Sequence, residues 1–272
     1  MAGSPRLLMV MALLVGLAAC SQGPDDGARG REEPRAGTAQ PETTAPERAA
    51  ATGGNAAAPR GAPDELDYVA LGDSLAAGVG AERGYVDRYA EHLRNDTGAG
   101  VRVVNLGVSG QTSSELLEAL RKDPATRRAL GGAEVVTFNI GINDLGRAGR
   151  AYEDGTCGGP DNEGCLREAV AAVERNWDAI GGEVLRLSST EDAVIRTAGL
   201  GYTPGVEGVF EPYLAEVNRH IAASADDNGI PHVEIRLGAG GLSQDGVHPN
   251  DEGYGKIADG LRELGYEPSS SR

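Results

Sequence analysis

From Asp64 onward, short apolar runs alternate with longer stretches in which apolar residues recur every three or four positions. Runs of the first kind predict strands, and stretches of the second kind predict helices. Strand–helix alternation requires right-handed crossovers, which produce a mainly parallel sheet with helices on both faces. The predicted strands are 66–71, 101–106, 134–140, 193–200 and 232–237. The predicted helices are 85–94, 114–121, 166–187, 211–225 and 250–264.

The charge of the chain limits its partners. The chain has 272 residues and a formal net charge of −16, and residues 64–272 carry all of that net charge, with 19 basic and 35 acidic side chains. Such an acidic surface repels phosphate backbones, so we expect no nucleic-acid partner. A segment of this length is sufficient for one α/β domain, 64–272, which we expect to be a monomer.

The N-terminal 20 residues have the pattern of an export signal. Arg6 supplies the positive charge, residues 7–17 form the apolar stretch, and small residues precede Cys20. The sequence Leu17-Ala18-Ala19-Cys20 resembles a bacterial lipobox, in which the cysteine is lipidated; the alternative is an ordinary signal peptide that ends in Cys. We therefore expect a protein anchored through Cys20 at the outer face of a bacterial membrane, or secreted if the anchor is released.

Residues 21–63 differ in composition from the rest of the chain. They contain no Val, Ile, Leu, Met, Phe, Tyr or Trp, but six of the 14 prolines. Such a segment cannot bury enough apolar surface to offset its conformational entropy. We expect a disordered tether between the anchor and the domain.

Four polar motifs follow predicted strands or begin a predicted helix. In a parallel α/β sheet, ligands bind beyond the carboxyl ends of the strands, where these motifs fall. The motifs are Gly72-Asp73-Ser74-Leu75, Asn105-Leu106-Gly107-Val108-Ser109-Gly110, Gly141-Ile142-Asn143-Asp144 and Asp245-Gly246-Val247-His248-Pro249-Asn250.

Together and in this order, the four motifs resemble those of the SGNH, or GDSL-type, serine hydrolases. The resemblance extends over essentially all of residues 64–267. It implies a three-layer flavodoxin-like sandwich around a five-stranded, mainly parallel sheet, in agreement with the strands predicted above. By contrast, the chain lacks the Gly-x-Ser-x-Gly of α/β-hydrolases and the glycine patterns of nucleotide-binding proteins.

The motifs supply the residue types that acyl transfer needs. Ser74 is the candidate nucleophile, which requires a base to take its proton. His248 is the candidate base, and Asp245 can accept a hydrogen bond from the far ring nitrogen and stabilise the imidazolium. The resemblance further implies an oxyanion hole formed by the backbone N–H groups of Ser74 and Gly110 and by the side-chain amide of Asn143. We expect Asp73 to order the turn.

The remaining cysteines and aromatic residues have less specific patterns. In an exported protein, we expect Cys157 and Cys165 to form a disulfide; in a cytosolic protein they would be free thiols. Tyr202, Phe210 and Tyr213 either line an acyl pocket or belong to ordinary packing. The other histidines lack a second ligand at metal spacing, so we expect neither a metal nor a cofactor.

The motifs define a reaction centre and leave the substrate open. The first hypothesis is a serine esterase or lipase that forms a covalent acyl-serine intermediate on a small-molecule or lipid ester. The second keeps the site but deacetylates a cell-envelope polysaccharide. A third, a binding lipoprotein without catalysis, predicts loss of Ser74, His248 or an oxyanion donor, and all of these are present.

Overall fold

The computed structural model describes residues 64–188, 192–201 and 208–269. The predicted signal peptide with Cys20, the predicted tether and Tyr202 lie outside the described residues. Within the described part of the chain, no helix is both long enough and apolar enough to cross a bilayer.

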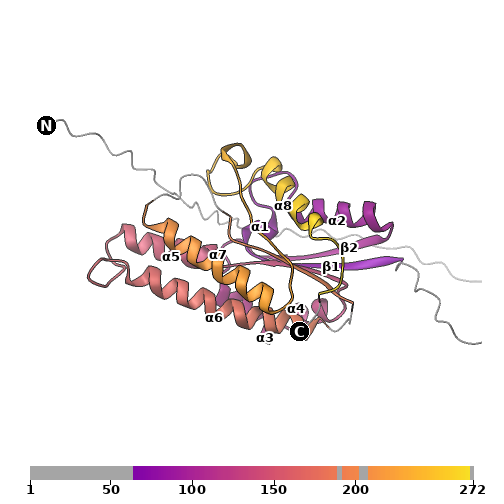
Figure 1. Ribbon diagram of the computed structural model, residues 1–272, viewed down its shortest axis with the longest axis horizontal. Coiled ribbons are helices and arrows are strands. Elements are labelled where there is room, and N and C mark those ends of the chain that lie inside the picture. Colours follow the sequence, from indigo (N-terminus) through magenta and orange to yellow (C-terminus); the bar gives the residue numbers. More distant parts are fainter. Residues whose placement is uncertain (1–63, 189–191, 202–207, 270–272) are drawn as a thin grey trace, which may run out of the picture. The chain divides into compact units, whose positions relative to one another are not determined.

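Five parallel strands form the central sheet in the order β2-β1-β3-β4-β5 (Figure 1). The prediction of a flavodoxin-like, mainly parallel sheet is confirmed. The chain runs from β1 outward to β2 and then returns to β3 on the other side of β1, which makes the ends of β1 and β3 the topological switch point where such folds bind ligands. The strands are β1 (Glu65–Gly72), β2 (Gly100–Gly107), β3 (Val135–Asn139), β4 (Val194–Ala198) and β5 (His232–Val233).

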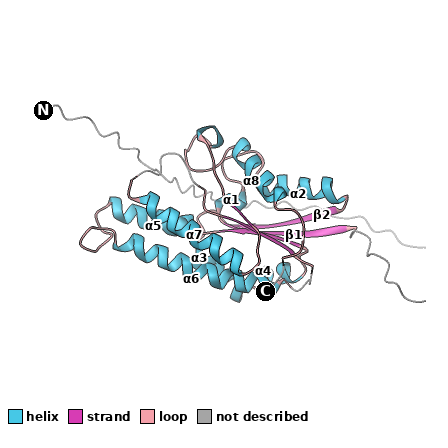
Figure 2. Cartoon of the chain, viewed as in Figure 1, coloured by secondary structure: helices cyan, strands magenta, loops and turns pink. Residues whose placement is uncertain are grey.

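Helices cover both faces of this sheet, as Figures 1 and 2 show. One layer packs on the core that contains Trp177 and Phe138, and the other on the core that contains Tyr68 and Tyr89. The first layer comprises α3 (Ser113–Lys122), α4 (Pro124–Gly131), α5 (Ile142–Glu153), α6 (Gly164–Leu187) and α7 (Phe210–Asp227). The second comprises α1 (Ser74–Ala77), α2 (Tyr85–Thr97) and α8 (Asp251–Glu263), and a short 3₁₀ turn, Ala239–Gly241, precedes α8.

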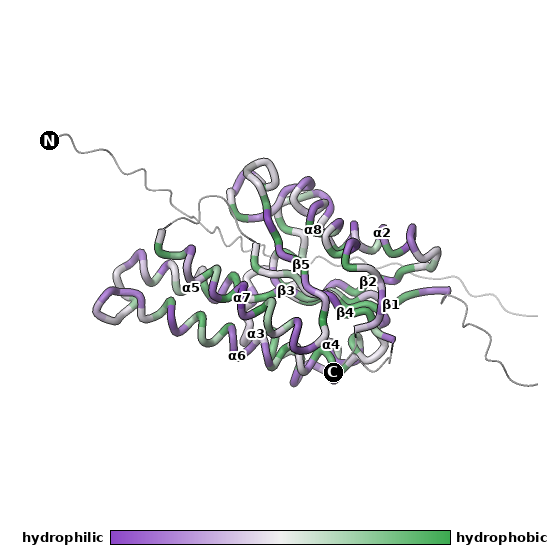
Figure 3. Tube along the Cα trace, in the orientation of Figure 1, coloured by the Kyte–Doolittle hydropathy of each residue, from purple (hydrophilic) through white to green (hydrophobic). Residues whose placement is uncertain are grey.

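The central strands are apolar on both faces because both faces are covered. All five residues of β3 and all five of β4 are buried, and Figure 3 shows apolar residues along the strands and at intervals along the flanking helices. The indole N–H of Trp177 donates to the carbonyl of Ile140 at 2.9 Å, so its polar atom is satisfied inside the core. This packing holds the end of β3 against α6.

Two features of the fold differ from the prediction. The predicted strand 232–237 forms a ladder only at His232–Val233, because its partner β4 ends at Ala198, opposite Val233. In addition, α1, α4 and α5 were not predicted. In α5 two glycines obscure the helical pattern, and the second, Gly149, is required by packing, since a Cβ there would lie 2.6 Å from the ring of Phe210 in α7.

Candidate active site

The candidate nucleophile begins the short helix directly after β1. Asp73 caps α1, because its Oδ1 accepts a hydrogen bond from the N–H of Leu75 at 2.9 Å. The hydroxyl of Tyr254 in α8 donates to the carbonyl of Val79 at 2.8 Å, which ties the segment after α1 to the C-terminal helix. Ser74 itself is 7% exposed, so its side chain is largely buried rather than on an open surface.

His248 connects Ser74 to Asp245. Its Nε2 lies 2.9 Å from Ser74 Oγ, and its Nδ1 lies 2.6 Å from Asp245 Oδ2. A carboxylate can only accept, so Nδ1 carries the proton and Nε2 is free to accept the hydrogen of the serine hydroxyl. The three candidate catalytic residues therefore form one continuous chain of hydrogen bonds, in the arrangement that activates a serine.

The second oxygen of Asp245 is held by its own loop. Its Oδ1 accepts from the Ser243 hydroxyl at 2.7 Å and from the N–H groups of Val247 and His248, each at 2.9 Å. Partial burial raises the pKa of Asp245, but the hydrogen bonds from His248, Ser243 and the two backbone groups outweigh burial, so the pKa lies below its ordinary value. Asp245 is therefore a fixed anion beside the imidazole.

The loop that carries Asp245 and His248 is tied to the start of α8. Ser243 N–H donates to the carbonyl of His248 at 2.8 Å, and the side chain of Asn250 caps α8 by accepting from Gly253 N–H at 3.0 Å. The Asn250 amide also donates to the carbonyls of Gly240 and Leu242. The backbone thus positions both residues.

The candidate oxyanion donors come from three segments of the chain, and Asn143 forms hydrogen bonds to the neighbours of the other two. Gly110 lies in the loop after β2 with a φ of +81°, a conformation that favours glycine. Asn143 lies in the first turn of α5, and its Nδ2 donates to the carbonyl of Gln111 at 2.9 Å and to Asp73 Oδ2 at 3.3 Å. Asn143 therefore contacts the residue that follows Gly110 and the residue that precedes Ser74.

Asp73 does more than order the turn before Ser74, because it also contacts Asn143. It is completely buried, and its two oxygens accept from Leu75 N–H and from the Asn143 amide. Burial raises the pKa of Asp73 to about 6, although the hydrogen bond from Leu75 and the proximity of His248 lower it in part. The sequence motif places Asp73 next to Ser74, but only the tertiary structure brings it to Asn143.

Three further residues near Asn143 had no assigned role in the sequence: Asp144, Ser113 and Asn176. Both oxygens of Asp144 accept hydrogen bonds from Ser113, at 2.9 Å from its N–H and 2.7 Å from its hydroxyl. Asn176 in α6 donates to the same hydroxyl at 2.8 Å. The position of Asp144 directly after Asn143 was the only available signal, because nothing along the chain pairs Asp144 with Ser113.

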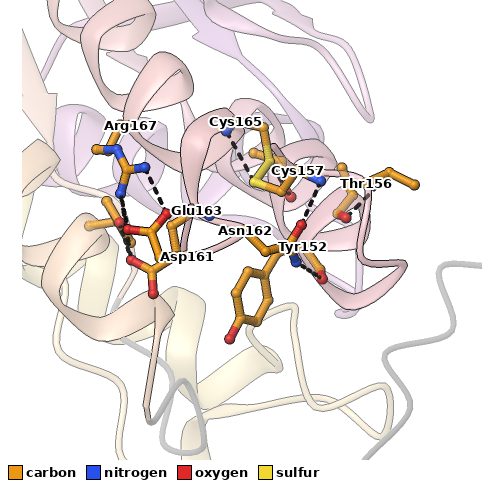
Figure 4. The surroundings of a disulfide bond; sticks show 11 residues. Tyr152, Thr156, Cys157, Asp161, Asn162, Glu163, Cys165 and Arg167 are labelled. Carbon is orange, nitrogen blue, oxygen red and sulfur yellow. Dashed lines mark hydrogen bonds and ion pairs between the residues drawn. A yellow bond between two sulfur atoms is a disulfide. The ribbon is translucent and has the colours of Figure 1, made fainter. Parts of the chain in front are cut away.

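A disulfide joins Cys157, in the loop between α5 and α6, to Cys165 in the first turn of α6 (Figure 4). Asn162 braces this loop, since it accepts from Cys157 N–H at 3.0 Å and donates to the carbonyl of Tyr152 at 2.9 Å. The disulfide therefore connects this loop to the start of α6, at the end of α5 opposite to Asn143.

The described aromatic candidates contact this region of α5 and the disulfide loop. Phe210 packs edge-to-face on Tyr152, with ring centroids 6.1 Å apart, and the hydroxyl of Tyr213 donates to Glu163 at 2.6 Å. These contacts are packing between α7 and the α5–α6 connection.

The other histidines lie outside the candidate site. His92 pairs with Asp259 at 3.0 Å, and His220 pairs with Asp178 at 2.9 Å. Burial lowers the pKa of His232. Across the described ranges, no group of three or more His, Cys, Asp or Glu side chains is arranged to hold a metal ion.

Comparisons with known proteins identify relatives in sequence and in fold. The spore germination lipase LipC of Bacillus licheniformis is 28% identical over 212 residues, which are 74% of this chain and 97% of the relative. The lipase Lip_vut3 from a goat rumen metagenome has a TM-score of 0.64 at 26% identity, covering 75% of this chain and all of that one. The acetylxylan esterase Axe2 of Geobacillus stearothermophilus shares the fold, with a TM-score of 0.56 at 22% identity over 76% of this chain and 97% of that one.

The match to a family extends over most of the described domain. The model of the GDSL-like lipase/acylhydrolase family covers residues 70–256, which include all four polar motifs. The chain therefore belongs to the GDSL-like lipase/acylhydrolase family and is a carboxylic ester hydrolase.

Proposed function

We propose that the protein hydrolyses esters through a covalent acyl-serine intermediate on Ser74. The observation that carries this proposal is the continuous chain of hydrogen bonds from Ser74 Oγ through His248 to Asp245, at 2.9 and 2.6 Å. His248 takes the hydroxyl proton as Ser74 Oγ attacks the carbonyl carbon, and the anionic Asp245 stabilises the resulting imidazolium.

The developing oxyanion needs donors, and the proposed donors are the N–H groups of Ser74 and Gly110 and the amide of Asn143. The tetrahedral intermediate expels the alcohol, which takes its proton from His248. A water molecule then attacks the acyl-serine with His248 as its base, which releases the carboxylic acid and returns Ser74 to its starting state.

For the substrate, we propose a small-molecule or lipid ester, as for an esterase or lipase. The likeness to LipC and to Lip_vut3, both called lipases, supports this choice. Deacetylation of a cell-envelope polysaccharide by the same site is the second candidate, and its support is the fold shared with the acetylxylan esterase Axe2. The two candidates differ in the alcohol that leaves.

The test compares the purified full chain with the Ser74→Ala variant on p-nitrophenyl acetate, a long-chain p-nitrophenyl ester and acetylated oligosaccharides. Ser224→Ala is a matched control, because Ser224 lies in α7 and its hydroxyl contacts Asp178, away from the site. We expect turnover that Ser74→Ala abolishes and that Ser224→Ala retains. Turnover of the sugars alone would exclude the lipase; full activity in Ser74→Ala would exclude the acyl-serine mechanism.

We further propose that the protein works as an exported monomer, anchored to a membrane through lipid on Cys20. A 43-residue flexible segment has a root-mean-square reach of roughly 35 Å, sufficient for the domain to reach substrate at some distance from the bilayer. After expression in a bacterium, we expect the wild type in the membrane fraction and Cys20→Ala in the soluble exported fraction. An unchanged distribution would contradict the anchor.

A further inference from the structure

The first two turns of α5 hold the loop that carries Gly110. The amide of Asn143 binds the carbonyl of Gln111 at 2.9 Å, and Arg147 Nη2 donates to the carbonyl of Gly110 at 3.2 Å. Asp144 accepts from both the N–H and the hydroxyl of Ser113. One helix thus binds three of the four consecutive residues 110–113.

Backbone hydrogen bonds also hold the start of this loop, because Val108 N–H donates to the carbonyl of Gly72 at 2.9 Å and Gln111 N–H donates to the carbonyl of Val108 at 3.0 Å. The loop follows the end of β2, and Val108 at its start is 52% exposed. No heavy atom beyond its immediate neighbours lies within 4 Å of the Cβ position at Gly110. No side-chain packing holds Gly110 itself, and the hydrogen bonds from α5 connect residues 110–113 to the helix that carries Asn143.

Asp144 makes the firmest of these contacts. Both of its oxygens are used, and Asn176 in α6 donates to the Ser113 hydroxyl from the other side, so the contact is supported by a second helix. Arg147 is half-exposed and is shared with Glu115 at 3.5 Å, which makes it the weaker anchor. Burial raises the pKa of Asp144, and the hydrogen bonds from Ser113 offset burial only in part.

We infer that Asp144 is a positioning residue that orients the oxyanion hole by fixing Ser113 and, through it, the loop of Gly110 against the helix that carries Asn143. This inference rests on the proposed function. Two donors from different elements serve a transition state only if their separation is fixed, and a displacement of about 1 Å can cost on the order of 100-fold in rate. The loss therefore falls on the chemical step rather than on substrate binding.

Substitutions of Asp144 test whether the loop needs its hydrogen-bond acceptors or only a side chain of that size. Asp144→Ala removes both acceptors of Ser113. Asp144→Asn keeps one oxygen for the Ser113 N–H and presents its amide to a hydroxyl that can itself accept. Asp178 is the matched control, because its Oδ1 accepts from the Ser224 hydroxyl at 2.8 Å and joins α6 to α7 away from the loop.

The experiment uses the full chain and measures kcat and KM on p-nitrophenyl acetate, inhibition by a short alkylboronic acid, and urea unfolding. A boronic acid forms a tetrahedral adduct with serine that places an oxygen in the oxyanion hole. For Asp144→Ala we expect kcat to fall about 10–100-fold, KM to change less than about threefold and boronate affinity to weaken in parallel. Asp144→Asn should recover part of the loss, and Asp178→Asn should stay within about twofold of wild type.

A kcat within threefold of wild type in Asp144→Ala would overturn the inference, as would a rise in KM at constant kcat. If Asp144→Ala does not fold, Asp144→Asn and Ser113→Ala decide by the same measurements. The absence of any Ser74-dependent turnover in the wild type would instead overturn the proposed function, and the positioning role with it. The two failures are therefore distinguishable.

Discussion

The amide of Asn143 donates to the carboxylate of Asp73 at 3.3 Å, between two residues that are 70 positions apart in the chain. Its other hydrogen is bound more closely, at 2.9 Å, by the carbonyl of Gln111. A developing oxyanion beside Ser74 would therefore compete for the hydrogen that Asn143 donates to Asp73, because that hydrogen bond is the longer of the two. The buried carboxylate that precedes the nucleophile keeps the proposed oxyanion donor in place before substrate arrives.

Asn143→Ala should lower kcat on p-nitrophenyl acetate by about 10²–10³-fold, because removal of one oxyanion donor has that effect in a serine hydrolase. KM should change little, since the interaction forms mainly in the transition state. Asn228→Ala is a suitable control, because its amide binds the carbonyl of Ser224 at the end of α7. A loss of less than threefold at Asn143 would assign it a structural role.

Asp73→Asn should change how stability depends on pH. Burial raises the pKa of Asp73 to about 6 from an ordinary 3.8, so the folded protein keeps a proton that the unfolded chain has lost between about pH 4 and pH 6. The contribution of Asp73 to the free energy of unfolding is therefore present below pH 4 and falls by roughly 3 kcal/mol as the pH rises through 6.

Urea unfolding of both proteins from pH 4 to pH 7 measures this effect as a difference. The free energy of unfolding of Asp73→Asn relative to wild type should rise by roughly 3 kcal/mol over this range. The offset at pH 4 records the other effects of the substitution, and carboxylates common to both proteins cancel. A pH-independent difference would show that Asp73 is ionised with an ordinary pKa.

Replacement of both Cys157 and Cys165 by serine should destabilise the domain while leaving activity within about threefold of wild type. A bond across eight positions restricts a short loop in the unfolded chain, which predicts a loss of about 2–3 kcal/mol in the free energy of unfolding. The effect on activity should be small, because Asn143 lies at the opposite end of a 12-residue helix, roughly 18 Å long.

Dithiothreitol should destabilise the wild type to the same extent and leave the double serine variant unchanged. A large fall in kcat in the double variant, at a temperature where it is folded, would instead make the disulfide part of the active-site scaffold.

The residues after α8 form a strap over a buried arginine. Arg196 in β4 is completely buried, and its guanidinium donates to the carbonyls of Gly265 and Glu267, each at 2.8 Å from Nη2. The hydroxyl of Ser269 donates to the carbonyl of Ile195 at 2.8 Å. Burial lowers the pKa of Arg196, and these carbonyls compensate its charge.

Truncation after Tyr266 should therefore cost about 3 kcal/mol or more, because it leaves a buried cation short of acceptors. The same truncation in an Arg196→Leu background should cost at least about 1 kcal/mol less, which a double-mutant cycle of urea unfolding measures. Equal costs in both backgrounds would mean that the strap acts independently of Arg196.

Local patterns along the chain were sufficient to predict the elements of the sheet and the identity of the catalytic candidates. Strands β1 to β4 were expected within two residues of their observed ends. For β3 and β4 the reason is that a strand covered on both faces is a continuous apolar run. Ser74, Asp245 and His248 could be chosen as catalytic candidates from their short motifs, in which Asp245 lies three residues before His248. The structure then brings both residues to Ser74.

Other features could not be predicted, because they depend on which elements become neighbours. The early end of β5 follows from the length of β4. The need for glycine at position 149 comes from the ring of Phe210, which lies on a different helix.

The polar contacts around the site likewise divide into those that follow from the local sequence and those that depend on the tertiary structure. Residue types and short spacings along the chain determine a nucleophile, a base and its partner, since hydrogen bonds over a few residues follow from local backbone geometry. The pairs Asp73–Asn143 and Asp144–Ser113 join segments 70 and 31 positions apart. Only the strand order β2-β1-β3 brings those segments together, so the tertiary structure alone decides how the proposed oxyanion hole is held.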